Sequence, residues 1–435
     1  MGQWVRCAKH CLPGSRRATQ GLAQGAMPGR PEKTLQQKDR GPLDGLSILD
    51  MATVLAAPYA ATLCADLGAD VVKLELPDGS DPLRQLAPVE GDVPLFWKVA
   101  NRGKRGITLD VRKPEGRALL LRMLPRFDVL VENFRAGTLE RWGLDLATLH
   151  AANPRLLVLR LTGFGQTGPY RQRPGFARIF EAMSGFTTLS GEAGGPPMHM
   201  NYPLGDVVAG VFGAFAICAE ALRLRGDPEA RGAEIDLAAT EAMFRLLDPL
   251  AVEYERLGLV RRRTGNLASY TAPSNVYRSG DGVDFTLVAS SDAVFRRLCA
   301  ALDWPALAED ARFRDNVARV AHRDALDAAL AGWFAAREYG GIAAALEAAA
   351  VPFSKAYSIE DVLADPQYRA REAVIRLPDP ELGSVPAPCV VPRVTGRNLP
   401  APRSGPATGE HNLEVYGALG VAGDELERLR EAGVV

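Results

Sequence analysis

The chain has 435 residues, of which 47% are hydrophobic, and this length predicts two domains or one large elaborated domain. The formal net charge of −1 gives no sign of a nucleic-acid partner or an anionic membrane surface. Glycines and charged residues interrupt the apolar runs, so we expect no membrane-spanning helix. The six cysteines contain no Cys-x-x-Cys pair, which indicates free thiols in a reducing compartment and no zinc site.

The first 41 residues differ from the rest of the chain. Residues 1–30 contain basic residues and no acidic one, and they lack the long apolar core of a secretory signal. Three interpretations stay open: a mitochondrial-type transit segment, a disordered tail, or an overlong start with initiation at Met27. We exclude this segment from the fold. We expect a cytoplasmic protein, or a protein of the mitochondrial matrix if the segment is a transit peptide.

From residue 42 the chain alternates between strand and helix patterns. Strands are predicted for LSILDMA, ADVVKLEL, GITLDV, DVLVENF and RLLVLRLTGFG, at residues 46–52, 69–76, 106–111, 128–134 and 155–165. Helical patterns lie between them at residues 58–68, 114–127 and, in part, 139–154. Strands separated by helices at this spacing predict an α/β fold with a Rossmann-like, mostly parallel sheet.

Parallel sheets of this kind bind ligands at the carboxyl ends of their strands. The polar tips at residues 132–134 and 162–165 are therefore placed at the ligand edge. The chain contains neither G-x-G-x-x-G nor G-x-x-x-x-G-K-[ST], which argues against the usual dinucleotide fingerprint and against P-loop chemistry.

The second half of the chain changes character twice. Residues 207–258 have a helical pattern, residues 261–287 have turn and strand chemistry with a hairpin candidate at 280–282, and residues 292–350 return to helices. The tail holds two short strand candidates, VIRL and VVPRVTG, and a final helix. We assign residues 42–238 to the first part of a large domain, 239–262 to a linker helix, 263–355 to a smaller inserted α+β domain, and 356–435 to the return of the large domain.

The stretch PLGDVVAG places Asp206 at the start of a long apolar helical run. One interpretation is an N-cap, because an aspartate oxygen accepts hydrogen bonds from the first helical turn. The other is a nucleophile, because a carboxylate in a low-dielectric pocket loses the water that would blunt its attack. From this stretch alone the cap is the commoner role.

Six segments in order resemble the class III CoA-transferases, a family that includes formyl-CoA and carnitine CoA-transferases and the related α-methylacyl-CoA racemases. They are PLDGLSILDMATVLAAPYAATLCADLGADVVKLE, NRGKRGITLDVRKPEGR, DVLVENFRAGTLERWGLD, NPRLLVLRLTGFGQTGP, GGPPMHMNYPLGDVVAG and GEHNLEV. The resemblance runs from residue 42 to the C-terminus. It implies an interlocked homodimer that acts on an acyl-CoA thioester and a carboxylic acid, with no metal and no redox cofactor.

The resemblance also implies roles for single residues. Asp206 occupies the place of the family's catalytic aspartate, which would form an aspartyl anhydride and then an aspartyl-CoA thioester. The positions that match the family's CoA contacts are Val54, Leu55, Ala56, Leu109, Asn133, Phe134 and Arg141. Each has an alternative: Leu109 and Phe134 suit a core, and Arg141 suits a solvated helix surface.

Several positions depart from the family pattern. Leu76 stands where a transferase often carries an arginine near CoA, so that contact is lost or is supplied by Arg84. The glycine-rich loop that shields intermediates in formyl-CoA transferase is not recognisable; RRRTGNLASYTAP occupies its region, with candidate pocket residues Gly265, Asn266 and Ser269.

Racemases of the family carry a histidine–aspartate pair just after the GFGQTGP segment. This chain has Phe176 and Ala177 there, and neither side chain exchanges a proton, which argues against a two-base racemase. Phe176 and His199 are candidate pocket residues, and His411 is expected to be structural.

The sequence therefore predicts a CoA-transferase. An acyl-CoA racemase and a non-catalytic subunit beside a paralogous chain remain the alternatives. The basic run at residues 261–263 favours a dicarboxylic partner such as succinate, with succinyl-CoA as donor, although a solvated basic turn is the commoner role of such a run.

Overall fold

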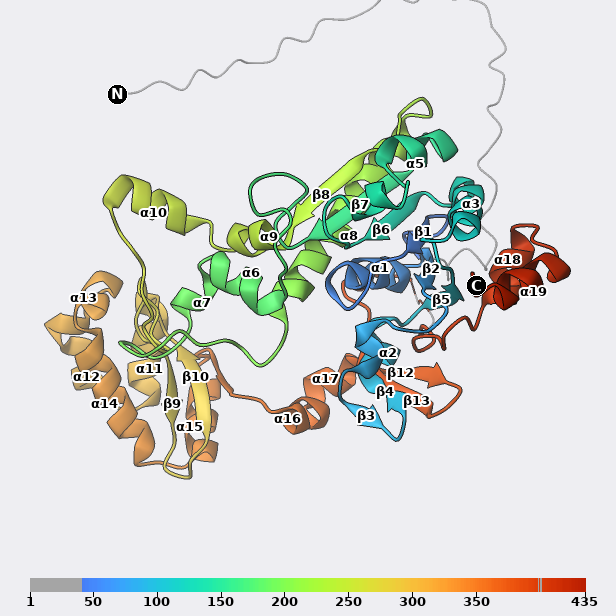
Figure 1. Cartoon of the computed structure of the whole chain (residues 1–435). Coiled ribbons are helices and arrows are strands. Elements are labelled where there is room, and N and C mark those ends of the chain that lie inside the picture. The colour runs from blue at the N-terminus through green and yellow to red at the C-terminus, as the bar shows by residue number, and fades with distance from the viewer. Residues whose placement is uncertain (1–40, 398, 400) are drawn as a thin grey trace, which may run out of the picture.

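The computed structural model describes residues 41–397, 399 and 401–435, and its larger part is built on one sheet (Figure 1). The strand order is β5-β2-β1-β6-β7-β8, and every neighbouring pair is parallel. The order reverses between β1 and β6, where a ligand crevice is expected. The strands are β1 (Ser47–Asp50), β2 (Asp70–Glu75), β5 (Lys104–Thr108), β6 (Val129–Glu132), β7 (Leu157–Thr162) and β8 (Glu234–Ala238). The predicted α/β class with a parallel sheet is confirmed.

Strand β8 lies in a stretch for which the sequence predicted a helix, so that prediction was wrong for residues 234–238. Ile235 and Leu237 alternate with charged residues, and this period of two fits a strand at the edge of the sheet. Both side chains pack against the buried cluster on one face. The helical pattern resumes with α9 (Ala239–Arg245), directly after the strand.

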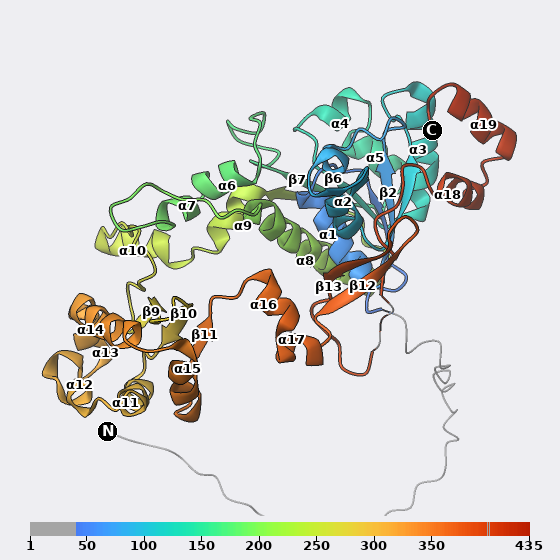
Figure 2. The ribbon, with the colours of Figure 1, turned by 90° about the horizontal axis from the view of Figure 1, so that it is seen from below.

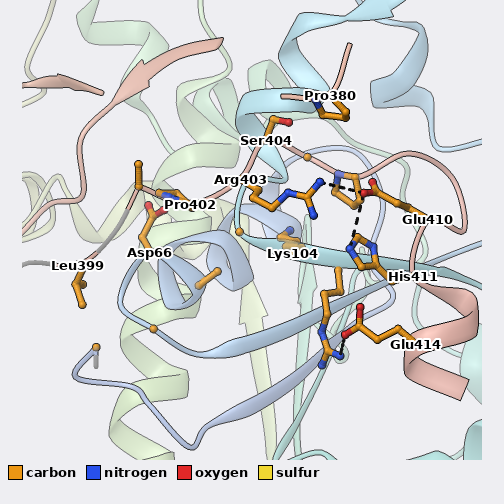
Figure 3. A pocket seen from close by; sticks show the side chains of 18 of the residues that line it. Asp66, Lys104, Pro380, Leu399, Pro402, Arg403, Ser404, Glu410, His411 and Glu414 are labelled. Carbon is orange, nitrogen blue, oxygen red and sulfur yellow. Dashed lines mark hydrogen bonds and ion pairs between the residues drawn. The ribbon is translucent and has the colours of Figure 1, made fainter. Parts of the chain in front are cut away.

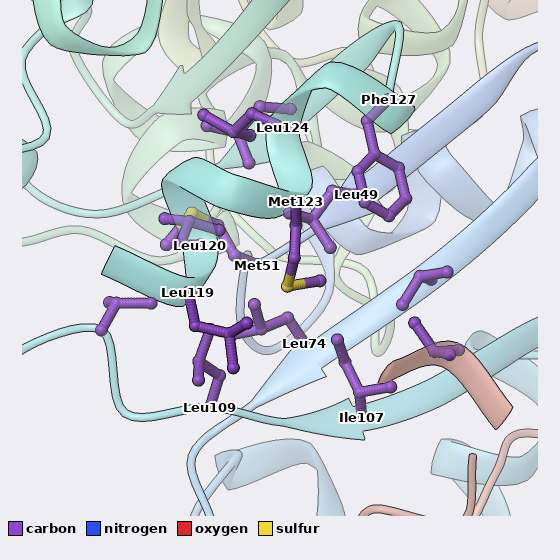
Figure 4. Close-up of a cluster of buried hydrophobic side chains, with 14 of the residues drawn as sticks. Leu49, Met51, Leu74, Ile107, Leu109, Leu119, Leu120, Met123, Leu124 and Phe127 are labelled. Atoms are coloured by element: carbon purple, nitrogen blue, oxygen red, sulfur yellow. The ribbon is translucent and has the colours of Figure 1, made fainter. Parts of the chain in front are cut away.

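Helices cover both faces of the sheet (Figures 1 and 2). One face packs against α1 (Ala56–Asp66) and α8 (Leu204–Gly226). In β1 the two faces alternate, because Ile48 belongs to the cluster under α1 and Leu49 to the cluster on the opposite face. Figure 4 shows Leu49 in that second cluster with side chains of β2, β5 and α3. The helices of the second face are α3 (Pro114–Met123), α5 (Leu146–Ala152), α18 (Asn412–Ala418) and α19 (Gly423–Glu431).

Helix α8 is long and apolar enough to cross a membrane by length and composition, contrary to the prediction that no run reaches such a length. One helix of this kind is weak evidence for a membrane span, because core helices pass the same test. The helix approaches α1 through two glycines. A Cβ on Gly210 would lie 2.7 Å from the carbonyl oxygen of Ala56, and one on Gly213 would lie 3.0 Å from the Cβ of Ala60. Small residues therefore set the close contact between α1 and α8.

A second body has its own three-stranded antiparallel sheet, in the order β11-β10-β9. Its strands are β9 (Ser274–Arg278), β10 (Asp284–Val288) and β11 (Phe353–Lys355), and residues 279–283 form the predicted hairpin turn. A separate apolar cluster centres on Phe285, Leu298 and Phe334. The covering helices are α11 (Asp292–Ala301), α12 (Pro305–Glu309), α13 (Asn316–Ala321), α14 (Arg323–Ala335) and α15 (Tyr339–Ala348), with a 3₁₀ turn η4 (Ala311–Phe313).

Two pairs of helices connect the two bodies (Figure 2). Helix α9 and α10 (Pro249–Leu257) lead out of the large body; the single helix expected over residues 239–262 is interrupted before Pro249, which cannot continue a helix from the preceding turn. Helices α16 (Ile359–Ala364) and α17 (Pro366–Ala370) lead back. The remaining short elements are η2 (Pro82–Gln85), β3 (Val89–Glu90), β4 (Val93–Pro94), α2 (Leu95–Ala100), η3 (Leu124–Arg126), α4 (Thr138–Arg141), α6 (Ala177–Met183) and α7 (Phe186–Leu189).

The C-terminal segment covers the edge strand β5. The backbone N–H of Gly106 donates to Nδ1 of His411 at 3.1 Å, and the N–H of His411 donates back to the Gly106 carbonyl at 2.8 Å. Asn412 accepts the N–H of Thr108 at 2.9 Å and donates to its hydroxyl at 2.8 Å. The GEHNLEV segment therefore satisfies an exposed sheet edge, and His411 has the structural role expected of it.

Two further predictions concern the tail and the cysteines. VIRL lies in β12 (Val374–Asp379), but its partner is β13 (Gly383–Pro388), and VVPRVTG at residues 390–396 is not a strand, which was a wrong prediction. The free thiols are Cys64, Cys218, Cys299 and Cys389, of which Cys64 and Cys299 are buried. The other two cysteines and the N-terminal extension lie outside the described residues.

Candidate active site

The loop that follows β1 is fixed by side chains from three other parts of the chain. The N–H of Thr53 donates to Oδ1 of Asn133 at 2.8 Å, and Nδ2 of Asn133 donates to the Thr53 carbonyl at 2.7 Å. The N–H of Val54 donates to Asp81 at 3.1 Å, and the buried ammonium of Lys73 donates to the Ala52 carbonyl. The N–H groups of Thr53 and Val54 and the carbonyls of Ala52 and Thr53 thus have partners within the protein, which hold the loop in one conformation.

The loop also contains a strained residue. Val54 has a φ of +65°, which is costly for a β-branched side chain. The surrounding hydrogen bonds hold it there, and helix α1 begins two residues later at Ala56. The predicted contact loop of Val54, Leu55 and Ala56 therefore has a defined shape at the switch point of the sheet.

An apolar cavity of about 290 Å³ lies beside this loop. Its walls include Leu74, Leu76 and Leu109, and Leu109 is fully buried. The rings of Phe134 and Trp142 close one side, edge to face with centroids 4.9 Å apart. A flat, apolar ligand group suits such walls.

A second cavity, of about 220 Å³, adjoins the first. Thr53 and Phe134 line both cavities. The second cavity brings together most of the predicted site, namely Val54, Leu55, Ala56, Asn133, Phe134, Phe176 and Asp206. A ligand with an apolar head and a long arm can therefore lie across the two and end at Asp206.

Asp206 lies in the first turn of α8 and does not cap it. The N-cap is Pro203, and no side-chain cap bond is present, so the N-cap interpretation of Asp206 does not hold. Among the residues that the structure describes, no hydrogen bond or ion pair reaches its carboxylate. Burial raises the pKa of Asp206 to about 7, and the negative charge of Glu181 adds to the increase. An acid with this environment, at the end of a cavity, is a candidate for chemistry.

Glu181 is a functional candidate that sequence reasoning missed. It lies on α6, only 1% of its surface is exposed, and its Oε1 accepts the N–H of Gly205 at 3.0 Å. Its Oε2 lies 3.1 Å from Nδ1 of His199, whose side chain is 29% exposed. The signal in the sequence was a lone acidic residue among the apolar positions of ARIFEAM. The predicted pocket residue His199 lines neither cavity and instead contacts Glu181.

Other predicted residues lie elsewhere. Arg141 is exposed, donates to the Thr138 hydroxyl at 2.8 Å and lines neither cavity. Gly265 and Asn266 are exposed and lie outside both cavities, and the N–H of Gly265 donates to the Gly191 carbonyl at 3.1 Å. Arg84 forms a two-pronged pair with Glu75, so it does not replace the contact missing at Leu76.

The basic run at residues 261–263 is largely engaged within the protein. Arg261 pairs with Glu253, and Arg263 donates to the carbonyls of Gly195 and Thr188 at 3.0 and 2.9 Å. Only Arg262 is exposed without a partner among the described residues. Two of the three arginines are therefore engaged within the protein, which argues against the interpretation that this run binds a dicarboxylate.

A third cavity, of about 540 Å³, lies away from Asp206, between β5 and the C-terminal segment (Figure 3). The charged groups around it pair with one another, as Arg403 does with Glu410 and Arg105 with Glu414. Satisfied pairs leave little to hold a charged ligand. No group of three or more metal-ligating side chains occurs within the described part of the chain.

The model of CoA-transferase family III matches residues 43–412. The chain belongs to this family. It is 38% identical over 403 residues to a succinyl-CoA–D-citramalate CoA-transferase of Chloroflexus aurantiacus, covering 92% of this chain and 99% of that protein. It is 36% identical to the alpha subunit of a succinyl-CoA–L-malate CoA-transferase of the same organism, covering 91% of this chain and 92% of the relative, and 36% identical to a beta subunit.

The fold agrees with the sequence comparisons. The crystal structure of a CAIB/BAIF family protein from Brucella suis is 34% identical and superposes with a TM-score of 0.78, over 87% of this chain and all of that one. The protein is thus a class III CoA-transferase, as the sequence predicted.

Proposed function

We propose that the protein moves CoA from an acyl-CoA donor, succinyl-CoA foremost, to a carboxylic acid through a covalent intermediate on Asp206. The observation that carries the proposal is the Asp206 carboxylate itself, which has no hydrogen-bond partner among the described residues and lines the second of two adjoining cavities. The choice of donor is supported by the relatives, whose names specify succinyl-CoA.

The proposed reaction has four acyl transfers. The Asp206 carboxylate attacks the donor thioester carbonyl, and the CoA thiolate leaves to give a mixed anhydride. The thiolate then attacks the aspartyl carbonyl, and the donor acid leaves as its carboxylate. The acceptor carboxylate attacks the aspartyl-CoA thioester and expels the thiolate, which finally attacks the acceptor's acyl carbon and frees Asp206. Each step exchanges one acyl bond for another, with no net proton transfer.

The environment of Asp206 suits this role. A carboxylate whose pKa is raised to about 7 is a stronger nucleophile than an ordinary aspartate and is still ionised above neutrality. Asp206 lies at the N-terminal end of α8, where the positive end of the helix dipole stabilises negative charge that develops on the aspartyl carbonyl. The apolar cavity at Leu109 and Phe134 would hold the adenine of CoA, and the fixed loop at Thr53 would guide the arm.

Trapping tests the proposal. The purified protein is incubated with succinyl-CoA and then with hydroxylamine, and peptides are mapped by mass spectrometry. We expect a hydroxamate on Asp206 that is absent from Asp206→Asn. An unmodified Asp206 in a protein that turns over the substrate would refute the covalent route. Asp227→Asn, at the other end of α8, is the matched control and should be trapped like the wild type.

Two other roles are less well supported. A racemase needs a second proton-exchanging group; Phe176 is exposed at the cavity and Ala177 is buried against Gly205, so neither position supplies one. A non-catalytic subunit has support from relatives named as alpha and beta subunits. Activity of the chain alone excludes the second role, and activity that appears only with a paralogous chain would establish it.

The assembly and location are also proposals. Large apolar side chains are exposed on α8 and α10, including Phe215 at 70%, Leu222 at 74% and Leu257 at 74%, and they support a homodimer that covers them. Light scattering gives the oligomeric state. We propose a cytoplasmic protein, or a protein of the mitochondrial matrix if residues 1–41 are a transit peptide, and imaging of the tagged full-length chain tests this.

A further inference from the structure

Three arginines line the cavity that contains Asp206. They are Arg135, Arg171 and Arg173, and Asp206 is the only acidic residue among the described residues that line it. No carboxylate of the described chain pairs with any of the three guanidinium groups. Arg173 instead stacks over the ring of Tyr170, 3.8 Å from its centroid. The cavity therefore has an excess of positive charge that the protein itself does not neutralise.

Three other arginines near the site are neutralised by carboxylates. Arg160 is paired with Glu132, Glu140 and Glu234, and Arg84 is paired with Glu75. Beside the apolar cavity, Arg112 is paired with Asp110. The arginines of the cavity that contains Asp206 thus have no carboxylate partner among the described residues, and a planar guanidinium offers the geometry that a carboxylate fits.

Arg171 and Arg173 lie on the loop between β7 and α6, on either side of an anchored residue. Gln172 donates through Nε2 to the carbonyl of Ala136 at 2.7 Å, which ties this loop to the one after β6. Gly175 packs so closely against Phe180 that a Cβ there would lie 2.5 Å from the ring. The two arginines are therefore carried by a segment that is fixed at the cavity wall.

We propose that Arg171 and Arg173 bind the non-reacting carboxylate of a dicarboxylate substrate, a succinyl group in the thioester or the free diacid. The inference rests on the proposed function, because it needs the acyl carbonyl to be placed at Asp206. It replaces the basic run at residues 261–263 as the site of dicarboxylate recognition. Arg135 is not part of the proposal. It follows Phe134, which lines both cavities, so Arg135 lies closer to the proposed path of the CoA arm.

A dicarboxylate also needs these cations on electrostatic grounds. The substrate's non-reacting carboxylate brings a third negative charge toward a site that already holds Asp206 and the buried Glu181. Without nearby cations the three charges repel one another in a partly desolvated pocket. An acyl group of the same length without a second carboxylate brings no such charge, so its binding should not depend on the arginines.

The first experiment compares succinyl-CoA with butyryl-CoA, which has the same four-carbon chain but no second carboxylate. For the Arg171→Gln/Arg173→Gln double variant we expect KM for succinyl-CoA to rise at least about 10-fold and KM for butyryl-CoA to change less than about 3-fold. The matched control is Arg126→Gln, an exposed arginine on η3 that lines neither cavity. It should leave both KM values unchanged. Thermal melts of both variants verify folding.

A binding measurement separates this inference from the proposed function. In the Asp206→Asn background no turnover occurs, and calorimetry gives the Kd of succinyl-CoA, butyryl-CoA and free CoA. We expect the two glutamine substitutions to weaken succinyl-CoA alone. Selective weakening here, combined with a wild-type protein that turns over succinyl-CoA while its Asp206 stays unmodified by hydroxylamine, would support the arginine site and refute the covalent route.

Two results would overturn the arginine site. Equal weakening of all three ligands would assign the arginines to the phosphates of CoA. Unchanged affinities and KM values would show that Arg171 and Arg173 bind none of these ligands. A double variant that fails to fold is replaced by Arg171→Lys/Arg173→Lys, which keeps the charge but loses the paired N–H groups, and a smaller selective loss is then expected.

Discussion

Glu181 accepts the backbone N–H of Gly205 at 3.0 Å, one residue before Asp206 in the same helical turn. Its other oxygen meets His199, so both carboxylate oxygens are occupied. The contact fixes the start of α8 and at the same time places a buried negative charge beside Asp206. One neighbouring side chain thus helps to fix the position of the Asp206 carboxylate and adds to the effect of burial on its pKa.

The rate should depend on pH through Asp206. Only the ionised carboxylate attacks a thioester, and its pKa is raised to about 7. We expect kcat/KM for succinyl-CoA to rise with pH and to level off above about pH 7. Asp206→Asn should lower kcat at least about 10³-fold, because the amide cannot form the anhydride. A flat profile between pH 5 and 8 would contradict the assignment.

Replacing Glu181 by glutamine should shift that profile. The amide oxygen can still accept the N–H of Gly205, but the negative charge that helps to raise the pKa of Asp206 is gone. Burial is the larger cause and remains. We therefore expect the acid limb of kcat/KM to move down by roughly one pH unit or less. Glu192→Gln, on an exposed loop, is the control and should leave the limb in place.

Asp206 should destabilise the folded protein above neutrality. Its pKa is about 7 when folded and about 3.8 when unfolded, so between these values the folded state holds a proton that the unfolded state has lost. The free energy of unfolding then falls as pH rises from about 4 to 7, by at most about 4 kcal/mol. Asp206→Asn removes this loss. Urea unfolding should show the variant more stable than the wild type at pH 8, with the difference reduced to about 1 kcal/mol at pH 4.5 and absent below about pH 3.

The C-terminal cover of β5 should matter for stability and for CoA. Asn412 makes two hydrogen bonds to Thr108 and is 7% exposed, so Asn412→Ala leaves buried groups unpaired and should cost about 1–3 kcal/mol of unfolding free energy. Leu109 follows the strand directly, so KM for acyl-CoA should rise as well. Leu413→Ala, at a side chain 72% exposed on the same helix, should change stability by less than about 0.5 kcal/mol. Equal effects of the two variants would refute the role given to Asn412.

Local patterns predicted most of the sheet and part of the site. Continuous apolar runs predicted β1, β2, β6 and β7, with ends one to three residues beyond the observed ones, because buried parallel strands have that composition. Strand β8 was missed because its five residues join directly to α9 and share its polarity. Asp206 was chosen through the family resemblance, since an acidic residue near a helix start has the appearance of a cap.

The rest of the site depends on contacts between distant segments. Asn133 and Thr53 are 80 residues apart. Nothing in either segment shows that the Asn133 side chain hydrogen-bonds to the backbone of Thr53. Glu181 and the unpaired arginines have the same difficulty, because pairing is decided by neighbours in space. The prediction that the basic run at residues 261–263 binds a dicarboxylate failed for this reason, because Arg261 pairs with Glu253 on α10.

The tight contact between Gly210 and the Ala56 carbonyl joins α8, which carries the proposed nucleophile, to the first residue of α1, directly after the loop proposed to meet the CoA arm. The close packing of α1 and α8 therefore sets the distance between this loop and Asp206. Under the proposed function, an acyl-CoA bound along the loop places its thioester carbonyl at a constant distance from Asp206. Acids that differ in chain length must then be accommodated on the far side of that carbonyl, so the reaction centre can be kept constant while substrate choice changes.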